Sequence, residues 1–585
     1  MNILGYSGLH GSIAFRRKNY ANLTENEYRM CQGLDSAACI FVNGEVVAAA
    51  EEERFNGEKY TCDFPVGAIE FCLREANLSV KELDYICHGF DYSNYEELLS
   101  MSKSGVNFYN EVLSPKIQIE LWQKHYPMFS IKHKFINVNH HLSHAATAFY
   151  PSGFDRALIL IADGIGESHS ISLFEGNESG ITLINNYGIL SSLGVLYSQI
   201  TAHLGFLVNS DEYKIMGLAP YGNANRYKHI FDDIIEYKDK GEISINKFAL
   251  NTTDIERQTG RGFRKWLSKN LCAPRSEHES VTQQHKDIAA ALQNAIQKCL
   301  FHILVYWGNK IDVSNLCMAG GVALNCTANG EIFRKKIFNN IYIQPAASDA
   351  GTAMGAAMVQ SSHIGQHPKS ISVLPPYYGP GLDDLSCEQA INKYKNKINY
   401  QKFSDSDLIR EAAHWITTRK IIAWMQGRME FGPRALGNRS ILADPTDPSM
   451  RDRINALVKK RESFRPFAPS VKLESAHEYF DMPHLHEFPH MLYTVPVREK
   501  YRSVLPAITH VDGSARVQTV NKNYAEKYWR LINEVEKTLG IPIILNTSFN
   551  VKGQPIVCTP IEAIQTLLDT NIDALFMGNY LITLQ

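Results

Sequence analysis

The segment Asn315–Asn325, NLCMAGGVALN, decides the fold class because it joins an apolar strand, a glycine pair and the start of a helix. Strand-to-helix turns of this kind are typical of α/β proteins, in which backbone N–H groups and the helix dipole can face a nucleotide. A glycine pair alone serves equally well as a close-packed turn without a ligand. We predict an α/β fold with a strand over Asn315–Ala319 and a helix from Val322.

The amino-terminal residues predict a strand, a tight turn and a hairpin. Met1–Ser7 is the expected strand, and Asn43-Gly44 separates two apolar runs at Ala38–Val42 and Glu45–Ala50. Both turn residues tolerate positive φ, which favours a type I′ hairpin. This succession is similar to the phosphate-loop start of actin-like ATPase folds. The polar segment between Phe15 and Leu34 interrupts it, and we interpret that segment as an insertion beside the site.

Two amphipathic or apolar segments predict helices farther along the chain. Phe64–Leu78, FPVGAIEFCLREANL, has Pro65 in the expected first turn. Ile288–Trp307 predicts a long helix ahead of the Asn315 strand. Between them, residues 223–285 are polar and predict a lid or an insertion. We expect this segment and the one after Phe15 to choose the substrate.

A change of composition predicts a domain boundary. Ser361–Gly381 is rich in Ser, Pro, Gly and His, with Pro375-Pro376 at its centre. The last motif of the following α/β unit is a strand at Ile541–Leu545, a loop and a helix. Thr559 as N-cap, Pro560 at the first helical position and Glu562 form a capping box there.

Composition bounds the class of protein. The chain has 585 residues, which indicates several structural units, and its formal charge of -2 gives no general attraction to nucleic acid or anionic membranes. The 11 cysteines are scattered without a C-x-x-C, as expected for reduced thiols. No apolar run approaches the length of a membrane span, and the start lacks the pattern of a signal peptide. We predict a soluble cytoplasmic protein.

Two histidines and two aspartates are candidate metal ligands. His140 and His144 are four residues apart and lie on one face of a helix. Asp163 follows the apolar run Ala157–Ala162, and Asp349 stands in a turn before another helix. Two imidazoles with two carboxylates suit iron, manganese or zinc better than calcium. A structural histidine pair with helix-capping aspartates explains the spacing equally well.

The stretch Gln426–Ser470 concentrates positive charge, with nine basic and five acidic residues. Several arginines stand beside Gly, Pro and Phe, as in Phe431–Gly437 and Ser463–Pro469, which indicates rigid guanidinium groups. A rigid guanidinium suits a small phosphate or carboxylate, since each charge-assisted bond contributes roughly 1.5 to 3 kcal/mol. Structural ion pairs in surface loops are the alternative.

Three strings in the same half carry a family resemblance: GRMEFGPRALGNRSILADP (Gly427–Pro445), FRPFAPSV (Phe464–Val471) and LNTSFNVKGQPIVCTPIEAI (Leu545–Ile564). They resemble the O-carbamoyltransferase family of nodulation and antibiotic-tailoring enzymes, and the resemblance extends over nearly the whole chain. It implies an actin-like ATPase (Kae1-like) domain at residues 1–365 that binds nucleotide and metal and transfers the carbamoyl group. A YrdC-like α/β domain at residues 366–585 would bind carbamoyl phosphate.

The resemblance also implies roles for single residues. HHLSHA (His140–Ala145), ADGIGE (Ala162–Glu167) and SDAGTAMGAA (Ser348–Ala357) look like the metal and nucleotide motifs. SDEYKIMGLA (Ser210–Ala219) also looks like a family motif, in which Glu212 and Lys214 would contact the acceptor or the nucleotide; an ordinary surface ion pair explains them equally well. By that match the metal ligands would be His140, His144, Asp163 and Asp349. The nucleotide-binding residues would be Gly320, Gly321 and Asn325. Carbamoyl phosphate would be bound by Arg434, Lys459, Arg465, Arg516 and Asn546, with Lys460 as an alternative to Lys459.

The catalytic candidates are His10, as general base for the acceptor hydroxyl, and Lys59. The family usually has His-Asp-x-Ser leading into the hairpin, whereas here Gly11-Ser12 follows His10. A similar copy, Leu34-Asp35-Ser36, comes after the insertion with Leu in the place of His. Which copy occupies the transfer site stays open, as does a purely structural role for His10.

The implied reaction is ATP-dependent O-carbamoylation. Carbamoyl phosphate would be activated as carbamoyl adenylate and passed to a hydroxyl of a small-molecule natural product. ATP, with Mg²⁺ where needed, and an iron ion, or manganese or zinc, would be the cofactors. Carbamoylation of tRNA adenosine, a metal-dependent hydrolase and a nucleotide sensor without catalysis are the rival hypotheses. The acceptor and the oligomeric state are not readable from the sequence.

Overall fold

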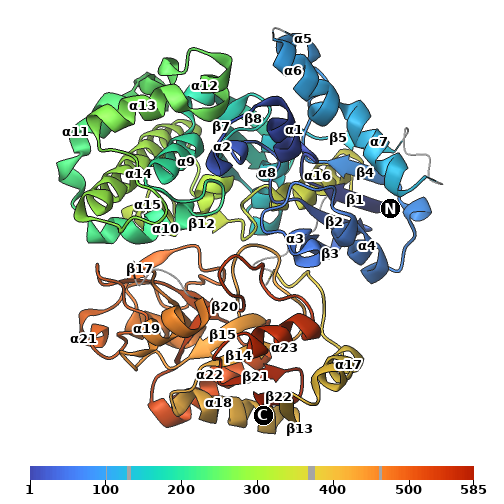
Figure 1. Cartoon of the computed structure of the whole chain (residues 1–585), viewed down its shortest axis with the longest axis vertical. Coiled ribbons are helices and arrows are strands. Elements are labelled where there is room, and N and C mark those ends of the chain that lie inside the picture. Colours follow the sequence, from blue (N-terminus) through green and yellow to red (C-terminus); the bar gives the residue numbers. More distant parts are fainter. Residues whose placement is uncertain (101, 128–133, 367–375, 460–463) are drawn as a thin grey trace. The chain divides into compact units, whose positions relative to one another are not determined.

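The computed structural model describes residues 1–100, 102–127, 134–366, 376–459 and 464–585 (Figure 1). The chain divides into two compact units. The first consists of Met1–Asn56 with Tyr60–Val373, and the second of Gly57–Lys59 with Leu374–Gln585. The boundary that we predicted at residues 365 and 366 adjoins residues 367–375, which include Pro375 and lie outside the described residues.

The first sheet of the first unit has the strand order β3-β2-β1-β4-β5 in the described residues. β1 and β2 are antiparallel, as are β2 and β3, whereas β4 runs parallel to β1 and β5 parallel to β4. Asn43 and Gly44 both have positive φ, so the predicted hairpin is confirmed. The strands are β1 (Asn2–Tyr6), β2 (Ala37–Val42), β3 (Glu45–Glu51), β4 (Tyr85–His88) and β5 (Phe135–Asn137).

The second sheet repeats this topology. Its order is β12-β11-β6-β7-β8, in which β6, β7 and β8 form an antiparallel meander and β11 and β12 are parallel to β6. A duplicated sheet of this order is the architecture of actin-like ATPases, so the predicted fold is confirmed. The strands are β6 (Ala157–Ala162), β7 (His169–Asn177), β8 (Gly180–Gly188), β11 (Asn315–Ala319) and β12 (Asn340–Ile343).

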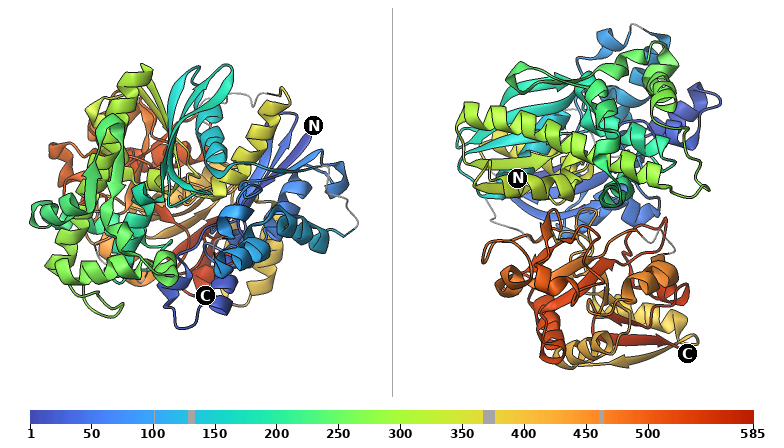
Figure 2. Two further views of the ribbon diagram at one scale, coloured as in Figure 1. Left: turned by 90° about the horizontal axis from the view of Figure 1, so that it is seen from above. Right: turned by 90° about the vertical axis from the view of Figure 1, so that its left-hand side faces the viewer.

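Two helices lie between the sheets of the first unit (Figure 2). α16 (Ala350–His363) packs on β1 and β2, and α8 (His140–Phe149) packs on β6 and β11. Both helices are almost completely buried, and they touch each other directly. Glycine permits this contact, because a Cβ atom on Gly355 would lie 1.8 Å from the carbonyl oxygen of Ser143. A Cβ on Gly5 in β1 would likewise lie 1.9 Å from the carbonyl oxygen of Ala353.

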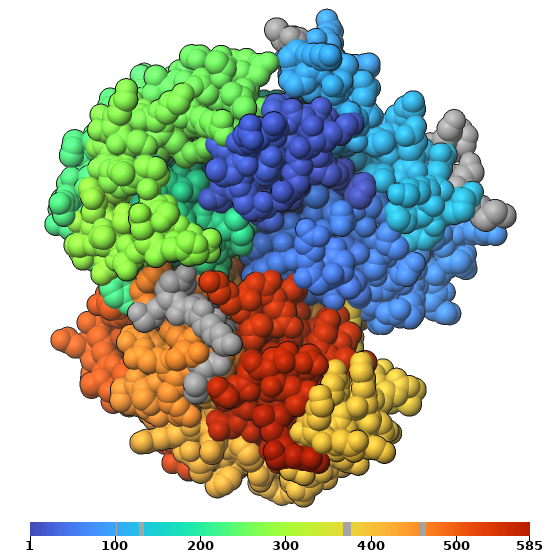
Figure 3. Space-filling model, viewed as in Figure 1, coloured from blue at the N-terminus to red at the C-terminus, as the bar shows by residue number. Residues whose placement is uncertain are grey.

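The segments that we interpreted as insertions are folded. Residues 12–32 include the short helices α1 (Ser12–Asn19) and α2 (Glu25–Tyr28), coloured dark blue in Figure 3. Residues 223–285 form a hairpin of β9 and β10, three α-helices and short 3₁₀ turns. The elements of the larger segment are α11 (Lys228–Ile234), β9 (Ile235–Tyr237), β10 (Ile243–Ile245), α12 (Asp254–Thr259) and α13 (Arg261–Asn270).

Several predicted boundaries need correction. α14 spans Gln283–Ile311 and is longer than the predicted Ile288–Trp307. Among the described helices, α14 alone is long and apolar enough to cross a membrane. Because 67% of that apolar window is buried in the unit, α14 is a core helix. Pro65 precedes α4 (Val66–Glu75) as its N-cap, because its φ suits that position and its missing N–H costs nothing there. The expected helix from Val322 is a 3₁₀ turn, Gly321–Leu324, followed by α15 (Cys326–Lys335).

The second unit is built on a mixed sheet of eight described strands in the order β13-β22-β21-β14-β15-β20-β16-β19. α18 (Asp405–Thr417) and α22 (Glu526–Leu539) pack on it around Trp424 and Phe576. The predicted capping box is confirmed at the start of α23 (Pro560–Leu568). The strands are β13 (Ile398–Lys402), β14 (Ile422–Met425), β15 (Arg439–Ala443), β16 (Ala468–Lys472), β19 (Gln518–Val520), β20 (Ile543–Ser548), β21 (Ala574–Met577) and β22 (Tyr580–Leu584).

The contact between α8 and α16 predicts a large cost for one added methyl group. In Gly355→Ala the new Cβ meets a backbone oxygen that cannot rotate away, so the helices must separate, and we expect the free energy of unfolding to fall by about 1–3 kcal/mol. Urea unfolding followed by circular dichroism measures this change. Gly188→Ala is the control, because its φ is -72° and nothing lies within 4 Å of the new Cβ. Equal unfolding midpoints for the two variants would contradict the argument.

Candidate functional site

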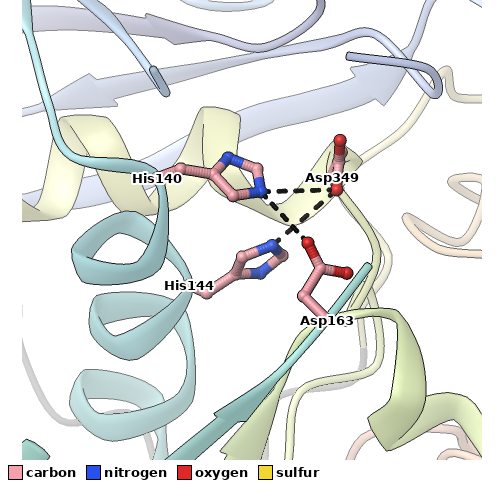
Figure 4. A group of neighbouring side chains, drawn as sticks. All are labelled: His140, His144, Asp163 and Asp349. Carbon is pink, nitrogen blue, oxygen red and sulfur yellow. Dashed lines mark ion pairs between the residues drawn. The ribbon is translucent and has the colours of Figure 1, made fainter. Parts of the chain in front are cut away.

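Four side chains from three elements converge in the first unit (Figure 4). His140 and His144 project from the first turns of α8, Asp163 directly follows β6, and Asp349 is the N-cap of α16. The Nε2 atom of His140 lies 3.4 Å from Asp163 and 3.5 Å from Asp349, and Nε2 of His144 lies 3.8 Å from Asp349. One potential ligand atom from each residue lies within 4.8 Å of all the others. The structure therefore brings all four predicted ligands together.

The surroundings fix the orientation of His140. Its Nδ1 lies 3.0 Å from the carbonyl oxygen of Gly89, to which it donates, and its ring stacks on Phe90 at 4.1 Å between centroids. This tautomer leaves Nε2 facing the carboxylates, and that atom is buried without a hydrogen-bond partner in the described residues. Glu167 accepts from the backbone N–H groups of His140 and Asp91 and so fixes the start of α8. Sequence reasoning missed Glu167, although it is the last residue of the ADGIGE string.

The electrostatics of the cluster suit a cation. Burial alone would raise the pKa values of Asp163 and Asp349, but the neighbouring imidazoles hold both below the usual range. Burial opposes charge on His140 as well, yet the two aspartates raise its pKa well above the ordinary value. Burial lowers the pKa of His144, which keeps it neutral. Ionised carboxylates and a neutral His144 are in the state in which such residues bind metal ions, and His140 would release its proton to become a ligand, so the residues fit the group.

The glycine pair lies against the same cluster. The backbone N–H of Gly321 donates to Oδ1 of Asp163 at 3.0 Å. Gly320 has φ +88°, and a Cβ there would lie 2.4 Å from the carbonyl oxygen of Ala162. The side chain of Asn325 is occupied, because it caps Ala328 N–H and forms two hydrogen bonds with Gln293. The glycines therefore lie beside the cluster, whereas Asn325 holds the turn together.

The two similar turns, at His10 and at Asp35, have different neighbours. His10 is half-exposed, and its Nδ1 lies 3.2 Å from the backbone N–H of Phe64 and 3.4 Å from Asp63. Asp35 accepts a hydrogen bond of 2.5 Å from Ser348, the residue before Asp349. The turns touch through the N–H of Leu9 and the carbonyl oxygen of Gly33. The Asp35 turn thus contacts the metal-ligand cluster directly, whereas the His10 turn reaches it only through the contact between the two turns. Lys59 is half-buried.

The sheet of the second unit gathers the predicted anion-binding residues at one edge. β15 and β16 are both antiparallel to β20, and β19 is parallel to β16, so the starts of β15, β16 and β19 and the end of β20 share an edge. Arg434, Arg465 and Arg516 come shortly before β15, β16 and β19, respectively. Arg434 and Arg516 are half-buried and Arg465 is 9% exposed. The side chain of Lys459 and all of Lys460 lie outside the described residues.

Buried polar groups hold the loop that carries Arg434. Asn546 is fully buried, and its Nδ2 donates to the carbonyl oxygen of Ala435 and to Ser470 and Gln518. Gln518 donates to the carbonyl oxygen of Leu436 at 2.8 Å. From the other side, Oε1 of Glu430 accepts from the N–H groups of residues 436, 438 and 439. These contacts make Asn546 a residue that positions the loop.

Arg439 does not belong to an open anion site. It is completely buried, and its guanidinium donates to carbonyl oxygens of Pro380, Gln426, Gly427 and Asn438. The guanidinium group of Arg439 is held by hydrogen bonds on several sides, as expected for this arginine-rich stretch, and these bonds connect the loop to its neighbours.

The chain matches two family models. One, described as Carbamoyltransferase N-terminus, matches residues 33–358, and the other, Carbamoyltransferase C-terminus, matches residues 413–584. The first range begins at Gly33 and so contains Asp35 but not His10.

Curated relatives cover most of the chain. The nodulation protein NolNO of Sinorhizobium fredii is 41% identical over an alignment of 586 positions, which covers 98% of this chain and 82% of the relative. The nodulation protein NolO of Bradyrhizobium diazoefficiens is 41% identical over 447 residues, 76% of this chain and 78% of the relative. Among solved structures, T. kodakarensis HypF aligns with a TM-score of 0.32 and 13% identity over 63% of this chain and 48% of its own.

The cluster predicts the metal content of single variants. His144→Ala and Asp349→Asn each remove one of four convergent ligands, and we expect metal affinity to fall by more than the roughly 10- to 100-fold typical of outer-shell mutations. Metal analysis by mass spectrometry after dialysis measures the metal-to-protein ratio. His141→Gln is the control on the same helix, since His141 contacts Ser172 outside the cluster. Equal metal content in all variants would exclude a metal site here.

Proposed function

The chain belongs to the carbamoyltransferase family, and on that premise we propose that it transfers the carbamoyl group of carbamoyl phosphate, through carbamoyl adenylate, to a hydroxyl of a small molecule. The observation that carries the proposal is that the matched family ranges contain both the metal-ligand cluster and the arginine-bearing sheet edge. The enzyme is thus a carbamoyltransferase whose two units divide the work between them.

In the second unit, Arg434, Lys459, Arg465 and Arg516 bind carbamoyl phosphate. The shared sheet edge of three of these residues supports the assignment. Guanidinium groups match a phosphate dianion because they offer paired N–H donors in a fixed plane. The fixed loop around Arg434 supports it further, since donors that are already in place need no reorganisation when the anion binds.

In the first unit, ATP binds at the Gly320-Gly321 turn, and His140, His144, Asp163 and Asp349 would hold a metal ion. We propose iron, with manganese or zinc as alternatives for this ligand set. The bound ion would supply positive charge that neutralises phosphate oxygens. The hydrogen bond from Gly321 to Asp163 supports a shared site for the nucleotide and the ion.

The chemistry runs in three steps. Water cleaves carbamoyl phosphate into carbamate and inorganic phosphate. A carbamate oxygen then attacks the α-phosphorus of ATP and displaces pyrophosphate. The acceptor hydroxyl then attacks the carbamoyl carbon, AMP leaves, and a base takes the hydroxyl proton. Activation is required because carbamate is a poor electrophile, and enclosure keeps the adenylate from water. His10 is the base that we propose, with the Asp35 turn as the alternative.

The partners follow from the same chemistry. Relatives carry the name nodulation protein, and we propose for this chain a small natural-product acceptor in the cytoplasm. A tRNA substrate would require a basic surface to neutralise phosphates, and the chain has a formal charge of -2.

Arg465→Ala tests the reaction. Removing this guanidinium takes away charge-assisted bonds to carbamoyl phosphate, so carbamoyl phosphate-dependent pyrophosphate release from ATP should fall by at least about 100-fold. Arg451→Ala is the control, because Arg451 is a surface residue paired with Asp452. Metal content should remain unchanged in both variants. Normal pyrophosphate release in Arg465→Ala would refute the assignment, and substrate hydrolysis without ATP in the wild type would indicate a hydrolase instead.

Comparison of His10→Ala with Asp35→Asn identifies the transfer turn. A lost general base lowers the rate by roughly 10²- to 10⁴-fold. We expect His10→Ala to lower carbamate formation on the acceptor by this factor while pyrophosphate release persists. Mass spectrometry of the acceptor, searching for one added carbamoyl group, measures the transfer. If only Asp35→Asn loses transfer, the Leu34-Asp35-Ser36 turn occupies the site.

A further inference from the structure

Residues Ser12–Gln32 form a strap across the first unit. Its helices α1 and α2 contact α12 and α13, although the two regions are more than two hundred residues apart in sequence, and the dark-blue strap lies against green residues in Figure 3. Arg16 donates to the side chain and the carbonyl oxygen of Gln258. Asn26 pairs with the backbone of Phe206 and Val208. The strap and the 223–285 segment are therefore one packed element.

Four arginines meet where the strap contacts α12 and α13. Arg16 and Arg29 are 4% and 9% exposed, and the side chains of Arg261 and Arg264 are 35% and 18% exposed. The carboxylate among them is Glu27, whose side chain is 3% exposed. Arg261 binds both of its oxygens, at 2.7 and 2.8 Å, and Arg264 binds Oε1 at 2.6 Å.

The charges of this cluster do not balance. Burial would raise the pKa of Glu27, but Arg261 and its other partners lower it to about 2, so it carries one negative charge. Burial raises the pKa of the Cys31 thiol, which lies near Arg16 and Arg29, to about 12, so the thiol is neutral. The other acids of these helices are paired elsewhere: Glu25 with Arg17, Asp254 with Arg257 and Glu256 with Lys265. Arg16, Arg261 and Arg264 thus share one carboxylate, and Arg29 lies with Arg16 near the neutral Cys31 thiol.

Several donors of the cluster have no partner in the described part of the chain. Nε of Arg16 is buried without a hydrogen bond. Arg29 donates from Nε to the carbonyl oxygen of Val208, and no described residue accepts from its two terminal nitrogens. Arg261 uses Nε and one terminal nitrogen, which leaves Nη1. Buried cations are ordinarily paired, because removal from water without a counter-ion is costly.

The strap connects this cluster to the metal-ligand cluster. Three residues after Arg29, the side chain of Gln32 donates to the carbonyl oxygens of Ile165 and Gly166, which follow Asp163. Tyr92 donates to Oε1 of Gln32 and holds it in place. Three residues farther on, Asp35 contacts Ser348 beside Asp349. A ligand at the arginines would therefore extend along the strap toward the reacting centre.

We propose that Arg16, Arg29, Arg261 and Arg264 form a binding site for an oxyanion, and that this anion is a phosphate, sulfate or carboxylate group of the carbamoyl acceptor. The assignment to the acceptor rests on the proposed function, whereas the anion site itself rests on the uncompensated charge. The site selects acceptors that carry a negative group at a distance from the hydroxyl that reacts.

Inorganic phosphate is the probe for the site. Equilibrium dialysis compares the wild type with Arg29→Gln and Arg261→Gln, in which we expect one class of phosphate site to weaken by about tenfold or more, as for loss of one charge-assisted bond. Arg17→Gln is the matched control on the same helix, since Arg17 is paired with Glu25 at the surface, and it should bind as the wild type does. Arg465→Ala removes phosphate binding in the second unit and so distinguishes it from phosphate binding at the strap. Unchanged phosphate binding in Arg29→Gln and Arg261→Gln overturns the proposal.

A measurement on the unaltered protein guards against misfolded variants. Phosphate should slow amide hydrogen exchange in residues 12–32 relative to chloride at equal ionic strength, and equal exchange in the two salts overturns the proposal. ATP affinity should be the same in Arg29→Gln and the wild type. If Arg29→Gln binds ATP more weakly, the anion bound by these arginines is a phosphate of the nucleotide, and the acceptor assignment is overturned. Carbamoyl phosphate-dependent pyrophosphate release in the wild type tests the proposed function separately, so the two failures are distinguishable.

Discussion

The direct contact between α8 and α16 is the constraint on which the first unit depends. Gly355 lets the backbone of α16 approach the carbonyl oxygen of Ser143, and Gly5 lets β1 approach α16 from the other side. Because His140 and His144 lie on α8 and Asp349 begins α16, the same contact sets the separation of the metal-ligand cluster. Backbone packed on backbone can shift little, so ligands on these two helices are held before any ion arrives.

Local chemistry made part of this structure predictable. Positive φ at Asn43-Gly44 and the capping box at Thr559 depend on a few adjacent residues, and both are present as expected. The convergence of His140, His144, Asp163 and Asp349 followed from helix spacing, from a strand end and from family motifs. The duplicated strand order was expected only through the family resemblance, because the two sheets share topology without sharing a sequence pattern. Pairing between distant strands depends on contacts that periodicity does not encode.

The roles of single polar residues were harder to predict. Asn325 and Asn546 stand in motifs that suggested ligand contacts. The amide of Asn325 bonds to Gln293, and Nδ2 of Asn546 bonds to the Ala435 loop, whereas Oδ1 of Asn546 has no partner in the described residues. A motif records that a residue type is needed, whereas only the structure shows whether it touches a substrate or supports a residue that does. In the second unit this support is extensive: Glu430, Gln518 and Asn546 fix from two sides the loop that carries Arg434.

The arginines of the strap differ from Arg439 in what satisfies them. Arg439 is fully buried, but backbone carbonyl oxygens accept from both of its terminal nitrogens, so its burial serves the stability of the loop. Arg29 donates from Nε to one carbonyl oxygen, and no described residue accepts from its two terminal nitrogens. The difference lies in these terminal nitrogens, because Nε lacks a described partner in Arg439 as it does in Arg16. An apolar residue would fill a purely structural position at lower cost, because it carries no desolvation penalty. Positive charge retained there is better explained by a ligand that neutralises it than by packing.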